Sequence, residues 1–412
     1  MTTNRRRMMA AVVPLCLLVG LSAAACGKTS SDSAGSSTPL SGSSASLSGE
    51  CGQVPSGKFD DTSGVIAGLG PTYENAYAGY ASTIEASTWA HFKPKGDGPY
   101  TVGVAFVSAY NAGQSNLTRA VVGGIKALPN VKKVVLLESD PAQPTQQGQQ
   151  ANQLVQQGVD ILITEPPIPT AFVTIAKAAA DAGIPMLSVL NETPSNDAIN
   201  LTSNSFRDGA VAAAAMAKDI KGTGTVLGVH GLPGVALDAN VFAGAKAAFA
   251  KCPGIKFDDS LTGGFDPATA KLVLSQYLGS HPGKIAGVVQ PGSMVSGILS
   301  AFQQSGRPVP PMTFFTETEG AYAYWASHVD SYTATGVGID SKAVGEATVR
   351  VVKLLLAGRG PKVNELVTPQ DVLTNDNVSG WVSPGASESD TRSATGPSSN
   401  FLPDSYLDKL FN

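Results

Sequence analysis

The sequence is poor in charged, aromatic and cysteine residues, and these shortages narrow the class of protein. Of the 412 residues, 15% are charged, 7% are aromatic and four are cysteines. The 28 basic residues stand against 32 acidic ones, a net charge of −4, whereas nucleic-acid binding needs clustered Lys and Arg. Nucleic acid is therefore excluded as a partner. The low charge, together with 45 Gly, favours a secreted or envelope α/β protein over a coiled coil or a disordered chain.

Long apolar runs and catalytic motifs are also scarce. Only one apolar run, near the N-terminus, approaches membrane length, which excludes a protein with several membrane spans. The four histidines are scattered, and none pairs with another His or Cys at a spacing typical of metal ligands. The body lacks a G-x-S-x-G nucleophile elbow, and no two carboxylates can be assigned acid and base roles. We therefore predict no enzyme activity, no cofactor and no metal site.

The N-terminus has the pattern of a secretory signal. Arg5–Arg7 form a positive region, and the apolar stretch that follows ends in small residues, which predicts a signal peptide over 1–25. Cys26 follows Ala23–Ala25 directly, an arrangement that resembles a bacterial lipobox, although Ala23 replaces the usual Leu. The alternative is an ordinary secretory cleavage site. We predict lipidation at Cys26 and a location on the extracytoplasmic face of a bacterial membrane.

A flexible tether and two further cysteines follow. Residues 27–50 include ten Ser and four Gly, too little apolar surface to fold, so they are predicted to form a flexible linker. Without residues 1–25, the chain has 25 basic and 32 acidic residues, a net charge of −7. Cys51 and Cys252 would then remain in an oxidising compartment, either as one disulfide or as two unpaired thiols.

From residue 101, short apolar runs alternate with amphipathic helical stretches. This pattern is typical of βαβ units and predicts an α/β fold with parallel sheets. The predicted strands are 101–107, 132–138, 159–164, 185–190, 224–229, 255–260, 285–290, 312–316 and 332–338. The predicted helices are 114–128, 145–157, 170–182, 206–219, 236–250, 267–279, 292–305 and 340–357. The strands and helices form two consecutive halves of similar size.

Several landmarks of this body occur in a recognisable order. Gly158–Asp160 precede one apolar strand, Gly183–Pro185 precede the next, and Gln304–Gly306 follow a helix. With their spacing, these landmarks resemble the type I periplasmic binding protein family over roughly 98–378, in its sugar-binding branch with the ribose-binding proteins. The resemblance implies two Rossmann-like lobes joined by a three-strand hinge and closing on a ligand. In such sheets, ligands lie beyond the carboxyl ends of the strands.

The resemblance also predicts a division of the chain. The predicted parts are a signal peptide (1–25), a lipidated Cys and Ser/Gly-rich tether (26–50), an N-terminal extension (51–97), an N-terminal lobe (98–202 plus 340–364), a C-terminal lobe (203–339 plus 365–380) and a Ser-rich C-terminal tail (381–412). The apolar residues near the end of the tail could dock onto the body.

Ligand contacts are expected in the loops after the strands. The predicted ligand-binding residues are Ser108, Tyr110, Asn111, Gln114, Asn191, Asp238, Asn240, Gln290, Glu317 and Glu319. This set departs from the family, whose sugar binders carry an Asp followed by Arg or Ser where Asn191 and Glu192 stand here. The predicted pocket is therefore richer in acids than in Arg. A sugar or polyol is expected by family, and the missing Arg and Asp add weight to an amine-bearing or less hydroxylated ligand.

Three functions follow from this sequence. The first is an extracytoplasmic solute-binding lipoprotein of an ABC importer, acting as a monomer with a membrane permease as its partner. The second is a receptor of the same fold that signals to a membrane partner, which a neighbouring permease and ATPase gene pair would argue against. The third, a secreted glycosidase, is disfavoured by the missing motifs.

Overall fold

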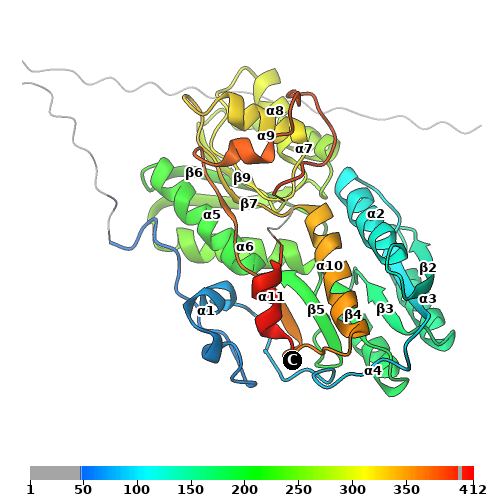
Figure 1. Cartoon of the computed structure of the whole chain (residues 1–412). Coiled ribbons are helices and arrows are strands. Elements are labelled where there is room, and N and C mark those ends of the chain that lie inside the picture. The colour runs from blue at the N-terminus through cyan, green and yellow to red at the C-terminus, as the bar shows by residue number, and fades with distance from the viewer. Residues whose placement is uncertain (1–46, 48, 398–400) are drawn as a thin grey trace, which may run out of the picture. The chain divides into compact units, whose positions relative to one another are not determined.

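The computed structural model describes residues 47, 49–397 and 401–412, which form an α/β body with two lobes (Figure 1). The signal peptide predicted over 1–25, the lipidation predicted at Cys26 and nearly all of the predicted tether lie outside these residues. Within the part that the structure describes, no helix combines the length and apolar character needed to cross a membrane.

The N-terminal lobe is built on a six-stranded sheet in the order β11-β5-β4-β3-β1-β2. Every neighbouring pair in this sheet is parallel. The strands are β1 (Tyr100–Val107), β2 (Val131–Ser139), β3 (Ile161–Thr164), β4 (Met186–Val189), β5 (Ala198–Ser203) and β11 (Glu365–Thr368). Because parallel strands need crossover connections, helices cover the sheet and its central strands are wholly buried.

The helices of this lobe begin and end with recognisable local signals. They are α2 (Ala112–Lys126), α3 (Pro144–Gln156), α4 (Val173–Asp181), which follows the short 3₁₀ helix Pro169–Phe172, and α10 (Ser341–Leu356). Asn111 and Asp340 cap α2 and α10 by accepting backbone N–H groups, and Pro144 starts α3. Gly158 follows the end of α3, and Gly183 follows the end of α4. Their φ angles of 68° and 70° are left-handed, the conformation that commonly terminates a helix.

The C-terminal lobe repeats the arrangement with shorter strands. One sheet has the order β7-β6-β8 and a second has the order β12-β10-β9, and a bridge between Val288 and Met312 links them. The strands are β6 (Thr223–His230), β7 (Gly254–Thr262), β8 (Ile285–Val289), β9 (Thr313–Phe314), β10 (Thr335–Val337) and β12 (Val372–Leu373). The helices are α5 (Ser205–Asp219), α6 (Ala236–Phe249), α7 (Pro267–Ser280), α8 (Val295–Gln304) and α9 (Glu319–Ser327).

Helices α5 and α6 pack closely because two glycines face the contact. A Cβ atom on Gly209 would lie 2.1 Å from the carbonyl oxygen of Val241, and one on Gly244 would lie 1.9 Å from that of Phe206. Only glycine allows the two backbones to approach this far. The packing of α5 on α6 therefore depends on these two positions.

Within the body, the chain crosses from one lobe to the other at three places. These connections join β5 to α5, β10 to α10, and β11 to β12. The last one corrects a predicted boundary: Glu365–Thr368 were assigned to the C-terminal lobe, but β11 pairs with β5 at the edge of the N-terminal sheet. After β11 the chain re-enters the C-terminal lobe at β12, which pairs with β10. All four residues of β11 are buried, and each pairs with a residue of β5. The segment is therefore a strand of the sheet and not a linker.

The C-terminal segment contacts both lobes in turn. Trp381, in the short 3₁₀ helix Val378–Trp381, and Ala394 are buried in the core of the C-terminal lobe. The apolar residues Phe401–Phe411, which include α11 (Asp404–Leu410), are buried in the core of the N-terminal lobe. The tail thus docks through its apolar end, and its earlier half is also packed on the body.

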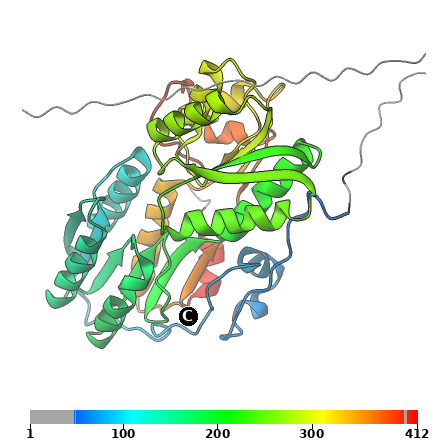
Figure 2. The same cartoon turned by 180° about the vertical axis from the view of Figure 1, so that it is seen from behind.

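The N-terminal extension covers the exposed edge of the N-terminal sheet. Its elements are the 3₁₀ helix Ala67–Leu69 and α1 (Pro71–Tyr77), which lies beside α11 in both views (Figures 1 and 2). The Tyr77 hydroxyl donates to the carbonyl of Glu365 at 2.6 Å and accepts from the N–H of Val367 at 3.2 Å. The hydroxyl of Tyr406 donates to the carbonyl of Val367. These contacts satisfy the backbone groups of β11, which an edge strand would otherwise leave free.

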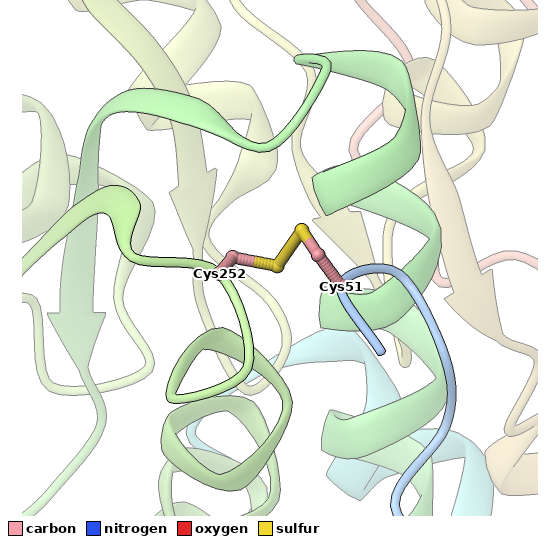
Figure 3. The surroundings of a disulfide bond; sticks show 2 residues. All are labelled: Cys51 and Cys252. Carbon is pink, nitrogen blue, oxygen red and sulfur yellow. A yellow bond between two sulfur atoms is a disulfide. The ribbon is translucent and has the colours of Figure 1, made fainter. Parts of the chain in front are cut away.

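A disulfide fastens the start of the extension to the C-terminal lobe. Cys51 and Cys252 are bonded, and they lie 201 positions apart in the sequence. Figure 3 shows that the bond joins the loop carrying Cys51 to the loop that follows α6. Asn204, the cap residue of α5 at the first crossover, also donates to the carbonyls of Ala76 and Ala78 in the extension. The extension is therefore bonded to both lobes and to the hinge.

A buried carboxyl group links the extension to the N-terminal sheet. Glu365 is fully buried and accepts from the Tyr80 hydroxyl at 2.7 Å and from the Asn200 amide at 2.7 Å. Burial, followed by the nearby charge of Glu192, raises the pKa of Glu365 to about 8. A carboxyl whose folded-state pKa is raised binds more protons in the folded than in the unfolded state. Its contribution to stability is therefore present at acid pH and is lost as the pH rises through about 8.

We expect removal of the disulfide to destabilise the fold. Replacing both Cys51 and Cys252 by Ser should lower the free energy of unfolding by about 2–5 kcal/mol, because the cross-link restricts a long loop of the unfolded chain. Denaturant melts of the oxidised protein and the double variant measure the difference. Reductant should destabilise the parent protein and leave the double variant unchanged; equal stability of the two oxidised proteins would contradict the prediction.

We also expect the stability to fall between pH 5 and pH 9, less steeply in Glu365→Gln than in the parent. The glutamine cannot ionise, and its amide can donate to the Tyr80 hydroxyl, which keeps the site hydrogen-bonded. The fall in the free energy of unfolding over this range should shrink by about 2 kcal/mol or more. Urea melts at both pH values test this, and parallel losses in the two proteins would show that Glu365 is not responsible.

Candidate functional site

An open pocket lies between the two lobes, at the carboxyl ends of the strands. It contains about 1060 Å³ of space outside the protein atoms, part of it open to solvent. The N-terminal lobe and the start of α10 contribute Val107, Tyr110, Asn111, Gly113, Gln114, Leu117, Pro141, Glu165, Pro167, Leu190, Asn191 and Ser341. The C-terminal lobe contributes Leu232, Val235, Leu237, Phe265, Pro291, Gly292, Ser293 and Thr316.

The loop after β1 and the start of α2 supply three of the predicted residues. The side-chain oxygen of Asn111 accepts the N–H of Gln114 at 2.8 Å, which fixes the first turn of α2 beside the pocket. Tyr110 is 52% exposed and presents an aromatic ring to the pocket. Gln114 is buried, and its amide donates to Glu165 at 2.6 Å. The structure therefore brings Tyr110, Asn111 and Gln114 together in the lining of one pocket.

Glu165 lines the pocket but was not among the predicted residues. It follows β3 directly, the position at which ligand contacts occur in parallel sheets, so its place in the sequence was an available signal. The side chain is 8% exposed, and burial raises its pKa to about 7, although the hydrogen bond from Gln114 lowers it. The pocket thus holds a carboxyl group that changes charge near neutral pH.

Asn191 lies in the pocket after β4, as predicted. It follows Leu190, whose φ of 65° is a left-handed conformation that side chains of this kind rarely adopt. The backbone N–H of Asn191 donates to the carbonyl of Val189, and its side-chain amide has no hydrogen-bond partner within the described residues. The amide is therefore available to a ligand. Such unusual backbone conformations are more frequent at functional sites than elsewhere.

The wall from the C-terminal lobe is mainly apolar. Phe265 contributes an aromatic ring from the loop between β7 and α7, again with a left-handed backbone (φ 59°). The Phe265 ring packs against the backbone of Gly231. A Cβ atom added to Gly231 would lie 2.2 Å from this ring. A residue other than glycine at 231 would push Phe265 out of this position. The pocket therefore has one aromatic ring from each lobe, Tyr110 and Phe265.

Three other predicted residues support the loops and do not line the pocket. Ser108 donates to the carbonyl of Ser139 at 3.0 Å and ties the end of β1 to that of β2. Asp238 accepts the N–H of Gly231 at 2.7 Å and contacts His230 at 2.7 Å, which holds the loop after β6. Asn240 is half-buried on α6, away from the lining residues. Each lies one residue or one helical turn from the position that reaches the pocket.

Gln290 and Glu317 are buried behind the wall of the C-terminal lobe. The Gln290 amide donates to the carbonyl of Thr313 at 2.7 Å and to Glu317 at 3.0 Å, while its oxygen accepts the N–H of Gly292 at 2.8 Å. These bonds hold the segment Pro291–Ser293, which does line the pocket. Burial raises the pKa of Glu317 to about 8. Both side chains therefore position the wall and do not themselves face the pocket.

Glu319 differs most from its predicted place. It is 2% exposed at the start of α9 and accepts the N–H of Ser383 at 3.0 Å and the hydroxyl of the same residue. This carboxyl fastens the C-terminal segment to the lobe. Because Glu319 follows a strand, the sequence predicts a ligand contact there. In the structure, the C-terminal tail packs against this carboxyl group instead, through Ser383.

The pocket is therefore much less acidic than the sequence suggested. Of the four acids expected around it, Glu192, Asp238, Glu317 and Glu319, none is among the lining residues, and Glu165 is the carboxyl group that is. Neither Lys, Arg nor His occurs in the lining given by the described residues. In that same part of the chain, no three His, Cys, Asp or Glu residues are grouped closely enough to hold a metal ion.

Comparison with known proteins agrees with this geometry. A model of the periplasmic binding protein domain matches residues 102–360. The ribose import binding protein of Bacillus subtilis (strain 168) is 23% identical over 284 residues, which cover 68% of this chain and 89% of that protein.

Solved structures share the fold. One is an ABC transporter solute-binding protein from Mycobacterium smegmatis with bound glycerol (TM-score 0.61, 17% identity, 70% of this chain and 98% of that chain). Another is an ABC transporter solute-binding protein from Bacillus halodurans C-125 with bound myo-inositol (TM-score 0.61, 20% identity, 69% and 98%). The predicted fold class and family are confirmed: this chain belongs to the periplasmic binding protein family and has its type I fold.

Proposed function

We propose that this protein is the extracytoplasmic solute-binding component of an ABC importer and holds a small sugar or polyol between its lobes. The observation that supports the proposal most is the pocket itself, in which hydrogen-bonding side chains of the N-terminal lobe face a largely apolar wall of the C-terminal lobe. Hydroxyl groups pair with the former, and the apolar face of a sugar ring stacks on an aromatic ring such as Tyr110 or Phe265.

The relatives support the same class of ligand and partner. A ribose import protein is similar to this chain in sequence, and two proteins of the same fold hold glycerol and myo-inositol. A rotation of the lobes about the three crossovers would close the pocket and remove the ligand from water. The ligand would then leave unchanged through a membrane permease, so the protein acts as a receptor and not as an enzyme.

The N-terminal sequence supports a lipid anchor. A signal peptide followed by Cys26 and a Ser/Gly-rich tether would hold the body, as a monomer, at the outer face of the cytoplasmic membrane. Cys51, which directly follows the predicted tether in the sequence, is bonded to Cys252 of the C-terminal lobe. Mass spectrometry of the membrane-bound protein would test the anchor, because a lipidated protein begins at Cys26 with a diacylglycerol adduct.

We expect the purified body to be stabilised by at least one member of a panel of pentoses, hexoses and polyols. A ligand at about 100 times its dissociation constant adds about 2.7 kcal/mol of stability, which a thermal-shift assay detects. The bound compound should be recovered chemically unchanged. A panel in which no compound shifts the melting temperature would argue against the proposal.

The pocket assignment has a matched test in two asparagines. Asn191→Ala removes a side-chain amide that lines the pocket and has no partner in the described structure, so binding should weaken about 5- to 100-fold while the fold is preserved. Asn240→Ala, on α6 and outside the lining, should bind as the parent does. Titration calorimetry compares the three proteins, and equal weakening by both substitutions would refute the assignment.

A further inference from the structure

Glu165 is the acidic side chain that lines the pocket, and the described lining residues include no Lys, Arg or His to balance it. Its Oε2 atom accepts from the Gln114 amide at 2.6 Å. Its Oε1 atom has no hydrogen-bond partner within the described residues, although the side chain borders the pocket. One of the two carboxyl oxygens is therefore available to a donor on the ligand.

The surroundings of Glu165 make an ionised carboxylate costly without a ligand. The side chain is 8% exposed, and apolar residues such as Val107, Leu117 and Pro167 share the lining with it. A charge in such surroundings loses hydration and is stabilised strongly by an opposite charge, because screening by water is weak. A cation that enters the pocket would supply that opposite charge, which no residue of the lining provides.

Tyr110 adds a second feature that favours a cation. Tyr110 lines the same pocket as Glu165, and its 52% exposure leaves the ring accessible to a ligand. The face of an aromatic ring attracts an ammonium group, most strongly where water is excluded. A carboxyl oxygen and an aromatic ring thus line the same pocket.

The rest of the lining suits hydroxyl groups. Asn191, Ser293, Thr316 and Ser341 offer uncharged donors and acceptors from both lobes and from α10. We propose that the ligand is a hydroxylated solute with one protonated amine, an amino polyol or amino sugar, whose ammonium group binds Glu165 while its hydroxyls bind these uncharged side chains. This inference rests on the function proposed above and narrows its class of ligand.

Matched pairs of compounds test the inference. Each pair contains a neutral polyol or sugar and the analogue in which an amine replaces one hydroxyl, such as sorbitol with 1-amino-1-deoxysorbitol and myo-inositol with an aminoinositol. We expect at least one amine to bind more than tenfold more tightly than its neutral partner in calorimetric titrations at pH 8. Binding of neutral members alone would overturn this inference and leave the proposed function standing. Failure of every compound would count against both.

The variant Glu165→Gln separates a charge interaction from a hydrogen bond. It should weaken binding of the amine at least about thirtyfold, because it removes one partner of a buried charge pair, and should change binding of the neutral analogue by a few fold at most. Glu138→Gln, an exposed acid at the end of β2, is the control and should bind as the parent does. An amine that binds Glu165→Gln and the parent equally would refute the role of this carboxyl.

The pH dependence gives an independent readout. The neutral Gln114 amide donates to Glu165, and Tyr110, the other ionisable side chain among the described lining residues, stays protonated below pH 10, so Glu165 is the group that titrates near neutrality. For an amine that is protonated throughout, affinity should rise about tenfold from pH 6 to pH 8 as the carboxyl ionises. In Glu165→Gln this rise should be absent. A flat profile in the parent would contradict the inference.

Discussion

The parallel pairing of the strands constrains the rest of the body. Strands that run the same way need crossover helices, so the carboxyl ends of all strands in a sheet meet at one edge. The six-stranded sheet of the N-terminal lobe and the β7-β6-β8 sheet of the C-terminal lobe obey this rule, and the loops after β1, β3 and β4 in one lobe therefore face those after β6, β7 and β8 in the other. The pocket results from this arrangement, and the helices supply its rigid support. A different pairing would scatter the same loops over the surface.

The two terminal segments modify this plan at the edge of the N-terminal sheet. Strand β11 would expose its backbone groups, but Tyr77 from the extension and Tyr406 from α11 satisfy them. The same segments are fastened to the C-terminal lobe, the extension through Cys51 and the tail through Ser383. Any rotation of the lobes must therefore move or strain these connections as well as the three crossovers. Asn204 joins the extension to the first crossover directly.

Buried carboxyl groups have two different environments in this protein. Glu365 and Glu317 are enclosed within the protein, where Glu365 accepts from several side chains and Glu317 from Gln290, so their raised pKa values follow from burial inside the fold. Glu165 is equally desolvated, but one of its oxygens faces a pocket that a solute can enter. The first two therefore influence how stability depends on pH. The third determines which charge a ligand can bring into the pocket.

The amino-acid sequence by itself determined the α/β class, the family and most strands and helices of the body, because these depend on local hydrophobic period and on capping residues such as Asn111. Three strands were missed, Ala198–Ser203, Glu365–Thr368 and Val372–Leu373, and in the first of them buried polar residues hide the apolar pattern. The sequence also indicated most of the loops that line the pocket, and four of the predicted site residues are among the lining residues. Only the tertiary structure decided side-chain direction, which put Glu165 in the pocket and Glu319 against Ser383, because that depends on neighbours distant in the chain.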